Sequence, residues 1–205
     1  SDPQRNALVE AFNSSERMVR LIGDFLSVSR LQTGKFVVEK KPTDLIKVVQ
    51  QEVDGLRIIA STHGQKLAFV HPKKELIIDI DEAKVRQVMM NFIDNAIYYS
   101  RADSAIHVVL SKLEDEVTFT VEDTGIGVPV DEQKKLFSKF FRATNARQQR
   151  PDGTGVGLFL AKKIISAHGG KIIFSSVEGQ GSTFGFRMPL KQKPDDTHDN
   201  KNDDK

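Results

Sequence analysis

The 205-residue chain contains no cysteine. Disulfide scaffolds, thiolate metal sites and cysteine nucleophiles are therefore excluded, and a reducing compartment is compatible with the composition without being required by it. An excess of one charge is also missing, because 30 lysines and arginines against 28 aspartates and glutamates leave a formal net charge of +2. This balance argues against a basic surface that binds nucleic acid or the headgroups of a membrane. No apolar run approaches membrane-spanning length and residues 1–10 lack the order of a signal peptide, so we expect a soluble segment.

The N-terminal residues 7–30 carry apolar side chains at helical spacing. These are Leu8, Phe12, Val19, Ile22 and Leu26, widened by Met18, Leu21, Phe25 and Val28. Gly34 suits the left-handed residue that ends such a helix. Because the stripe is too broad to be left in water, we expect it to pack on another helix, from a dimer mate or from a part of the protein outside this chain.

The rest of the chain mixes two patterns and belongs to the α+β class. Runs typical of strands occupy residues 35–39, 66–70, 75–80, 105–113, 116–123, 171–176 and 182–189. Helical patterns occupy residues 44–60, 82–100 and 156–168. A layer of helices packed on a mixed sheet is the expected architecture. The tail, residues 191–205, has no apolar side chain and should be disordered.

The helix expected at 82–100 raises a chemical question. Asp81 is a plausible N-cap, and an apolar face follows it. That face comprises Val85, Val88, Met89, Phe92, Ala96 and Tyr99. Asn91, Asn95 and Tyr98 form a second face beside it. The two amides either bond to neighbouring backbone, the commoner outcome for such a pair, or offer neutral oxygens to a Mg²⁺ ion whose negative charge comes from a triphosphate.

Two glycine-rich segments could complete a nucleotide site. In EDTGIGVP (122–129), Gly125 and Gly127 permit a tight turn, and Asp123 could accept a hydrogen bond from an exocyclic amine; a plain strand-end turn is the alternative. In DGTGVGLF (152–159), glycines lead directly into a helix, whose N-terminal N–H groups suit phosphate. A simple hinge explains this second segment equally well when it is taken alone.

The order of these segments is more specific than any one of them. The asparagine helix, DTGIG, LFSKFFRA (136–143), GTGVGL and GQGSTFGF (179–186) resemble the ATP-binding domain of bacterial sensor histidine kinases over residues 44–190. Residues 17–35 resemble the second helix of the dimerisation and phosphoacceptor hairpin of that family. The resemblance implies the Bergerat fold, a two-layer α/β sandwich whose mixed, mostly antiparallel sheet is covered by three helices and preceded by one long hairpin helix. It divides the chain into a hairpin helix (1–34), a linker or first strand (35–43), the catalytic domain (44–190) and the tail.

The same resemblance implies roles for individual residues. Asn95 would coordinate Mg²⁺, Asn91 would support it near the phosphates, Asp123 would read adenine, and Arg142 would reach the terminal phosphate; Asn91, Asn95 and Arg142 are the catalytic candidates. The further residues expected at the nucleotide are Tyr98, Tyr99, Gly125, Ile126, Gly127, Phe137, Phe141, Gly153, Thr154, Gly155, Val156, Gly157, Leu158, Gly181 and Thr183. Phe137 and Phe140 or Phe141 would anchor a lid that closes over the triphosphate. Arg147 and Arg150 could add charge from that lid, where exposed arginines are more often solvated.

Two departures from the family pattern affect these expectations. Tyr98 stands where the family often has lysine, so one phosphate cation is missing. None of the five histidines lies in an acceptor context, so the acceptor helix should precede Ser1 in the intact protein. The fragment should bind ATP and Mg²⁺ but not phosphorylate itself. The resemblance further implies a cytoplasmic segment of a homodimeric kinase that serves a response regulator and contacts neither nucleic acid nor the membrane.

Two other interpretations remain open. Related ATPases of the topoisomerase, heat-shock chaperone and mismatch-repair types activate water with a glutamate four residues before the metal-binding asparagine, a position that is Asn91 here. A regulatory or degenerate module that binds nucleotide, or only a partner, without transfer is the second alternative. Tyr98 keeps it open, while Asn95, Asp123 and the glycines weigh against it.

Overall fold

The structure is a computed structural model that describes residues 36–190 without a break, together with residues 15, 18, 19, 22, 23, 25, 26, 28, 29, 31 and 33. Several expectations therefore lie outside the described residues. They concern Leu8, Phe12 and Leu21 of the N-terminal stripe, Gly34 as its end, and the tail at 191–205.

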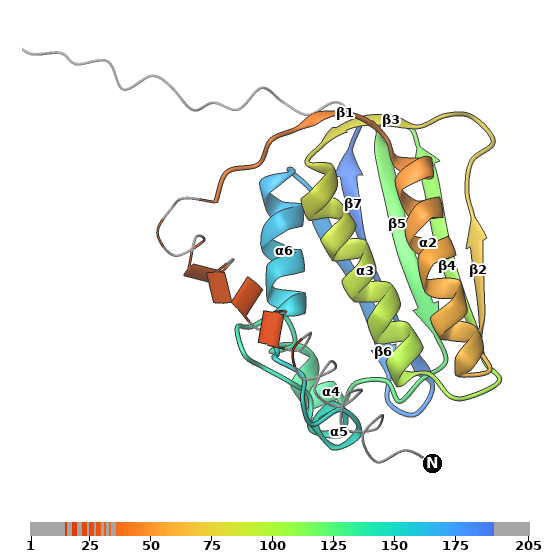
Figure 1. Ribbon diagram of the computed structural model, residues 1–205, viewed down its shortest axis with the longest axis vertical. Coiled ribbons are helices and arrows are strands. Elements are labelled where there is room, and N and C mark those ends of the chain that lie inside the picture. The colour runs from red at the N-terminus through yellow and green to blue at the C-terminus, as the bar shows by residue number, and fades with distance from the viewer. Residues whose placement is uncertain are drawn as a thin grey trace, which may run out of the picture.

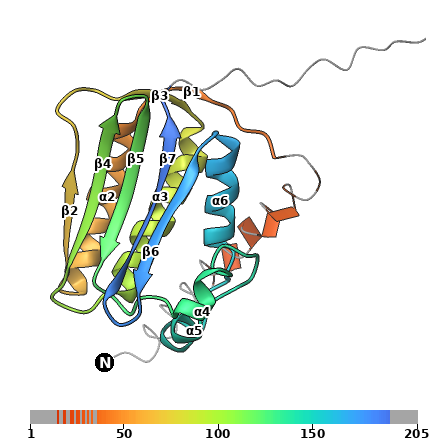
Figure 2. The same ribbon diagram turned by 180° about the vertical axis from the view of Figure 1, so that it is seen from behind.

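One layer of the domain is a five-stranded mixed sheet with the strand order β2-β4-β5-β7-β6. Its strands are β2 (Lys66–Val70), β4 (Ala105–Leu113), β5 (Glu116–Asp123), β7 (Gly181–Pro189) and β6 (Lys171–Val177). β2 runs parallel to β4, and the other neighbours pair antiparallel. Figure 2 shows the face of this sheet that none of the helices within residues 36–190 covers. The expected mixed, mostly antiparallel sheet is confirmed.

The second layer consists of α2 (Leu45–Thr62), α3 (Glu82–Tyr99) and α6 (Gly157–Ala167), which cover one face of the sheet (Figure 1). Two short helices, α4 (Val130–Gln133) and α5 (Thr144–Gln149), lie in the segment between β5 and α6 at one end of the layers. Asp44 and Asp81 cap α2 and α3 with side-chain bonds to backbone N–H groups, as the sequence predicts for Asp81. Both expected layers of the sandwich are therefore present.

Side chains that alternate along the central strands form the core between the layers. On β5 and β7 the buried apolar side chains are Val117, Phe119, Val121, Phe184, Phe186 and Met188. The rings of Phe119 and Phe186 stack with centroids 5.2 Å apart. Each fully buried phenylalanine of this kind contributes roughly 1.5–3 kcal/mol through removal of apolar area from water.

The strand predicted at residues 35–39 is wrong. Residues 36–40 have no regular structure, although burial alternates from Phe36 to Lys40 as it would on a strand. The backbone N–H of Glu39 donates to Asp81 Oδ2 at 3.1 Å and is thus taken by a side chain instead of a neighbouring strand. The first strand is β1 (Lys41–Asp44), which pairs antiparallel with β3 (Ile77–Ile80) in a separate two-stranded sheet.

A buried histidine joins the ends of two helices. His168, which is 0% exposed, caps α6, and its Nδ1 lies 2.7 Å from the Ile164 carbonyl. Its Nε2 accepts the backbone N–H of Asp81 at 3.0 Å, so the ring is neutral with the proton on Nδ1. Asp81 in turn bonds to Lys84 Nζ at 2.6 Å. The C-terminus of α6, the N-terminus of α3 and the segment at Glu39 are therefore joined by one set of polar contacts.

The N-terminal stripe is largely uncovered among the residues that are described. Met18, Val19 and Phe25 are 62%, 71% and 68% exposed. Val28 is the exception within this described part, because it is buried against Val156 and Leu160 around the start of α6. The exposed positions agree with a helix that needs a further apolar partner.

Candidate functional site

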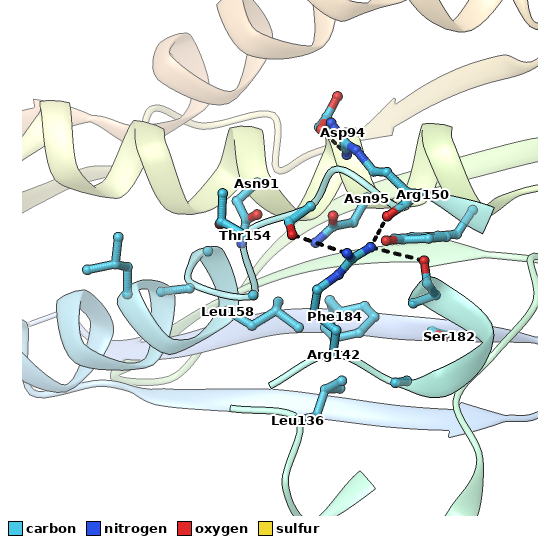
Figure 3. A pocket seen from close by; sticks show the side chains of 18 of the residues that line it. Asn91, Asp94, Asn95, Leu136, Arg142, Arg150, Thr154, Leu158, Ser182 and Phe184 are labelled. Carbon is cyan, nitrogen blue, oxygen red and sulfur yellow. Dashed lines mark hydrogen bonds and ion pairs between the residues drawn. The ribbon is translucent and has the colours of Figure 1, made fainter. Parts of the chain in front are cut away.

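A cavity of about 620 Å³ opens between α3, the start of α6 and the sheet. In Figure 3, Asn91 and Asn95 extend from α3 into this space, while Ser182 and Phe184 approach it from the sheet. The segment that includes α5 and the glycines before α6 borders the rest of the cavity. Segments that lie far apart in the sequence therefore meet here.

Asp123 marks one end of the cavity, where β5 stops. Burial of its carboxyl group raises its pKa to about 6, although hydrogen bonds from the backbone N–H groups of Gly125 and Ser182 act in the opposite direction. Gly125 donates to Asp123 Oδ1 at 2.8 Å. A partly desolvated carboxylate at a concave surface is suited to accept a hydrogen bond from a buried ligand amine. We call this end of the cavity, with residues 123–128, the base end.

The loop at the base end is fixed by backbone contacts. Ile126 donates its N–H to the Tyr99 carbonyl at 3.2 Å and accepts from the Gly179 N–H at 2.8 Å. At Gly125 a β-carbon would lie 2.3 Å from the Tyr99 carbonyl oxygen, so a side chain there would clash with backbone. The loop thus packs directly on the end of α3, and glycine at this position is a steric requirement.

A serine pair supports the same loop from the sheet. The Ser176 hydroxyl accepts the Val128 N–H at 2.9 Å, donates to the Gly181 carbonyl at 3.0 Å and lies 2.9 Å from Ser182 Oγ. Ser182 faces the cavity with Phe184, whereas Thr183, which the sequence analysis placed at the nucleotide, is not among the lining residues. Side chains alternate along β7, so Thr183 lies on the opposite face of the sheet.

The asparagines lie at the other end of the cavity, opposite the start of α6. A β-carbon on Gly157 would lie 2.5 Å from Asn91 Oδ1, so the absence of a side chain there lets α6 approach α3 closely. Asn91 Nδ2 is buried and has no hydrogen-bond partner in the structure. Asn95 lies one turn further along α3 and also lines the cavity. This end, with Asn91, Asn95 and residues 153–158, is called the phosphate end below.

The start of α6 provides backbone donors at the phosphate end. Its N-cap residue, Val156, makes no side-chain capping bond, which leaves N–H groups of the first turn available to an anion. Within residues 36–190 and the other described positions, no group of three or more His, Cys, Asp or Glu side chains could hold a metal ion. A cation bound here would therefore take its ligands from amide oxygens and from the ligand itself.

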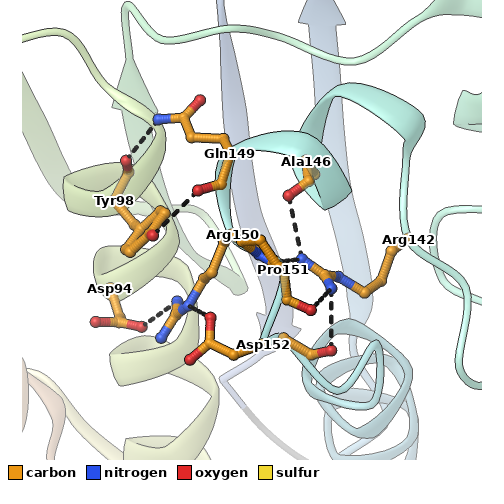
Figure 4. A network of polar contacts seen from close by, with 9 residues as sticks. Asp94, Tyr98, Arg142, Ala146, Gln149, Arg150, Pro151 and Asp152 are labelled. Carbon is orange, nitrogen blue, oxygen red and sulfur yellow. Dashed lines mark hydrogen bonds and ion pairs between the residues drawn. The ribbon is translucent and has the colours of Figure 1, made fainter.

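Arg142 organises the lid segment, which we define as residues 137–156. Its Nη1 donates to the carbonyls of Pro151 and Gly153, each at 3.1 Å. Its Nη2 donates to the carbonyls of Ala146, at 3.1 Å, and Arg150. The four N–H bonds of the two terminal nitrogens are thus directed at backbone (Figure 4), which leaves little of the guanidinium for a phosphate in this arrangement.

A second network fastens the lid segment to α3. The Tyr98 hydroxyl donates to the Gln149 carbonyl at 3.2 Å, and Gln149 Nε2 donates to the Tyr98 carbonyl at 3.0 Å. The Arg150 guanidinium lies 4.5 Å above the Tyr98 ring, and its Nη1 lies 3.0 Å from Asp94 Oδ2. Although burial lowers the pKa of Arg150, the charge and hydrogen bond of Asp94 hold it above its ordinary value. Figure 4 shows this network beside the contacts of Arg142.

Most of the predicted nucleotide-binding residues line the one cavity. They are Asn91, Asn95, Tyr99, Asp123, Ile126, Gly127, Phe141, Arg142, Gly153, Thr154, Gly155, Gly157 and Leu158. Those that do not line it are Tyr98, Gly125, Phe137, Val156, Gly181 and Thr183. Phe137 instead packs edge-on against Phe174, with centroids 5.7 Å apart, and so ties the start of the lid segment to the sheet. Phe140 is 60% exposed.

Sequence reasoning missed several residues that line the cavity, among them Ser182, Asp94 and Asn145. Ser182 could have been found, because the inward positions Phe184 and Phe186 on β7 place it on the same face. Asp94 and Asn145 also line the cavity. Asn145 Nδ2 donates to the Gly127 carbonyl at 2.9 Å and so connects α5 with the base end. The two residues are 18 positions apart, and no periodic pattern in the sequence predicts this contact.

Comparisons with known proteins agree with this geometry. Residues 80–192 match the family described as histidine kinase-, DNA gyrase B- and HSP90-like ATPase. The sensor histidine kinase WalK of Bacillus subtilis (strain 168) is 32% identical over 189 residues, which are 91% of this chain and 31% of WalK. The chain thus spans about a third of that relative's length. Within the described residues, no helix has both the length and the apolar character that a membrane crossing requires.

Two solved structures have the same fold. Full-length ShkA in complex with AMPPNP aligns with a TM-score of 0.79 and 26% identity, covering 94% of this chain and 40% of ShkA. The histidine kinase AdeS of Acinetobacter baumannii aligns with a TM-score of 0.76 and 20% identity, covering 94% of this chain and 88% of AdeS. Because AdeS is only 20% identical, its likeness shows that the two proteins share a fold and nothing about their function.

Proposed function

Because the chain belongs to the family of histidine kinase-, DNA gyrase B- and HSP90-like ATPases and carries an ATP-binding catalytic domain of the histidine kinase type, we propose that this domain transfers the γ-phosphoryl of Mg-ATP to a histidine outside the chain. The observation that carries the proposal is the shared cavity. A desolvated carboxylate, two helix amides and the open start of a helix line the same space, at separate ends.

At the base end, Asp123 would accept the exocyclic amine of adenine while Ile126 packs on the flat ring. At the phosphate end, the N–H groups at the start of α6 would receive the phosphates. Asn95 would hold Mg²⁺ together with phosphate oxygens, and Asn91, whose Nδ2 has no partner in the structure, would donate to the same group of oxygens. The ion would neutralise phosphate charge, and the protein would contribute position and electrostatics without a covalent nucleophile.

The proposal extends to the parent protein. Residues 1–34 would be the second helix of a dimerisation hairpin, residues 35–43 a linker that ends in the first strand, residues 44–190 the catalytic domain and residues 191–205 a tail. The acceptor histidine would lie on the missing first helix, and the intact protein would be a homodimer that passes its phosphate to a response regulator. The segment would lie in the cytoplasm and contact neither membrane nor nucleic acid.

A calorimetric titration of ATP into the chain, with and without Mg²⁺, tests nucleotide binding. We expect binding that Mg²⁺ strengthens, and we expect Asn95→Ala to lose about 30-fold in affinity, a value typical for the loss of a ligand to a charged group. Without Mg²⁺ the variant should bind as the unaltered chain does, which makes the metal-free titration the control. If Mg²⁺ strengthens binding equally in both proteins, Asn95 is not the metal ligand.

The transfer step needs its own assay. With ATP labelled at the γ-phosphate, the chain alone should incorporate no label, whereas a separately supplied first hairpin helix with its histidine should become labelled. Phosphohistidine formed on the chain itself would overturn the proposed location of the acceptor. Steady release of phosphate that is lost in Asn91→Ala would instead support a hydrolase of the related ATPase type.

A further inference from the structure

At position 98, α3 lacks the lysine that the resemblance implies as a phosphate ligand. Two of the three arginines in the lid segment are candidates to take the place of that lysine. Tyr98 occupies the position where the resemblance leads one to expect lysine, and it does not line the cavity. Arg142 and Arg150 both line it. Their surroundings differ in a way that decides between them.

Arg142 is bound by neutral backbone acceptors. Four carbonyls of the lid segment take its terminal N–H bonds, so turning the guanidinium toward a phosphate would break the contacts that shape the segment. Three of these contacts are part-buried and the one to Pro151 is exposed, so each carbonyl would lose a hydrogen bond of modest net strength. Arg142 is therefore suited to a structural role within the lid segment.

Arg150 is bound by an anion that another anion can replace. Its Nη1 pairs with Asp94 at 3.0 Å, and its Nε lies 4.0 Å from Asp152 Oδ1. The Tyr98 ring supports the guanidinium plane from one face at 4.5 Å, which fixes its orientation without using an N–H donor. The Tyr98 hydroxyl holds the backbone of the preceding residue, Gln149. The side chain is thus oriented by a ring and neutralised mainly by one carboxylate.

The position of Asp94 connects this pair with the nucleotide. Asp94 precedes Asn95 on α3, and both residues line the cavity with Arg150. A phosphate placed at Asn95 would therefore lie beside a carboxylate and a guanidinium that currently pair with each other. The guanidinium forms paired hydrogen bonds with phosphate as readily as with carboxylate, and a triphosphate carries more charge than one aspartate.

We propose that Arg150, held on the Tyr98 ring, is the cation that binds the terminal phosphates of ATP, and that Asp94 competes with those phosphates for it. The proposal rests on the proposed function and names a residue for it that stands in for the missing lysine. Tyr98 acts as a positioning residue, since it orients the arginine and does not itself contact the phosphates. A nucleotide without the outer phosphates should gain little from Arg150.

Calorimetric titrations of ATP and AMP into the full chain test the proposal. Arg150→Gln should weaken ATP binding by about 10- to 100-fold, as expected for losing a charge-assisted hydrogen bond, and change AMP binding by less than about threefold. Asp94→Asn removes the competing charge and should strengthen ATP binding by about three- to tenfold. The matched control is Arg147→Gln on α5, three residues before Arg150, because Arg147 is exposed and does not line the cavity.

The two variants are expected to change the affinity for ATP in opposite directions, which distinguishes a role of Arg150 in binding phosphate from a role in holding the lid segment. If the ion pair only held the lid segment in place, both Arg150→Gln and Asp94→Asn would weaken ATP binding, and that result would overturn the proposal. An unchanged ATP affinity in Arg150→Gln would also overturn it while leaving the proposed function intact. If the unaltered chain binds no ATP, both fail together. Should Arg150→Gln not fold, Arg150→Lys, which keeps the charge, must still prefer ATP over AMP, though less strongly than arginine does.

Discussion

The base end and the phosphate end of the cavity are held by different kinds of contact. At the base end, the backbone hydrogen bonds of Ile126 and the half-buried Ser176 hydroxyl fix the loop against α3 and the sheet. At the phosphate end, the lid segment is held by one arginine that donates to carbonyls and by another that pairs with an aspartate. The first set of contacts can stay unchanged when a ligand binds, whereas the second includes a pair that an incoming anion can exchange. Under the proposed function, this difference would separate recognition of the base from recognition of the phosphates.

The largest expected effect comes from removing the carboxylate at the base end. Asp123→Ala should weaken ATP, ADP and AMP alike by about 100-fold, because each would lose the same hydrogen bond to a charged acceptor. Calorimetry with the three nucleotides measures this. Glu122→Ala is the matched control, since Glu122 is exposed and alternation places it on the other face of β5. A loss confined to ATP would mean that Asp123 acts on the phosphates instead.

The pKa of Asp123 predicts how the base end responds to acid. Burial raises it to about 6, so the carboxylate that accepts the amine is lost as the pH falls below that value. If the charged form alone binds, affinity at pH 5 should be about tenfold lower than at pH 8. Adenosine is the ligand to use, because it has no phosphate to titrate, and Asp123→Asn should remove the dependence. A flat profile for the unaltered chain would show that protonation does not weaken the contact.

A smaller effect is expected from loosening the lid segment. Arg142→Gln removes donors from the carbonyls of Pro151 and Gly153 and should weaken ATP binding by about fivefold, as loss of a few exposed hydrogen bonds does, while adenosine binding stays the same. Limited proteolysis should then cut within residues 137–156 faster than in the unaltered chain. Equal losses for ATP and adenosine would contradict the separation of the two ends.

A separate effect, on stability and not on binding, concerns a site outside the cavity. Burial lowers the pKa of His168, helped by Lys40 and Lys84, while the Ile164 carbonyl and Asp81 act in the opposite direction. Below the unfolded-state pKa of about 6.5, the unfolded chain therefore binds a proton at this histidine more readily than the folded chain does. The free energy of unfolding should then fall by up to about 1.4 kcal/mol for each unit by which the pH is lowered. Urea titrations at pH 7 and 5.5 measure this, and the extra loss should be absent in His168→Gln. If both proteins lose stability equally, other groups account for the change.

Local patterns in the sequence predicted much of the fold. The strands at 105–113 and 116–123 alternate cleanly and are found as predicted. Residues 36–39 alternate in burial as well, yet they form no strand, and the Glu39 N–H donates to Asp81, more than forty positions later, instead of to a neighbouring strand. Alternation therefore reports which side chains are buried, and strand formation also requires a neighbouring strand to accept the backbone bonds.

The candidate site was predictable where its residues are close in sequence. Asn91 and Asn95 share a helix face, and Gly153 to Leu158 precede or begin a helix, so spacing alone places them. Local spacing does not distinguish Thr183 from Ser182, whereas the alternation along β7 places Ser182 on the side of the cavity. The stack of Arg150 on Tyr98 joins two residues about fifty positions apart, and no periodicity links them. Such contacts depend on how the lid segment folds back, which only the structure shows.

The contacts of His168 have a mechanical consequence. α6 is 11 residues long, about 16 Å at the usual helical rise, and it begins at the phosphate end and ends at His168. His168 holds Asp81, and Asp81 holds the backbone of Glu39, where the chain enters the domain. The bonds of His168 and Asp81, together with the rigid length of α6, thus connect the segment where the chain enters the domain with the phosphate end of the cavity.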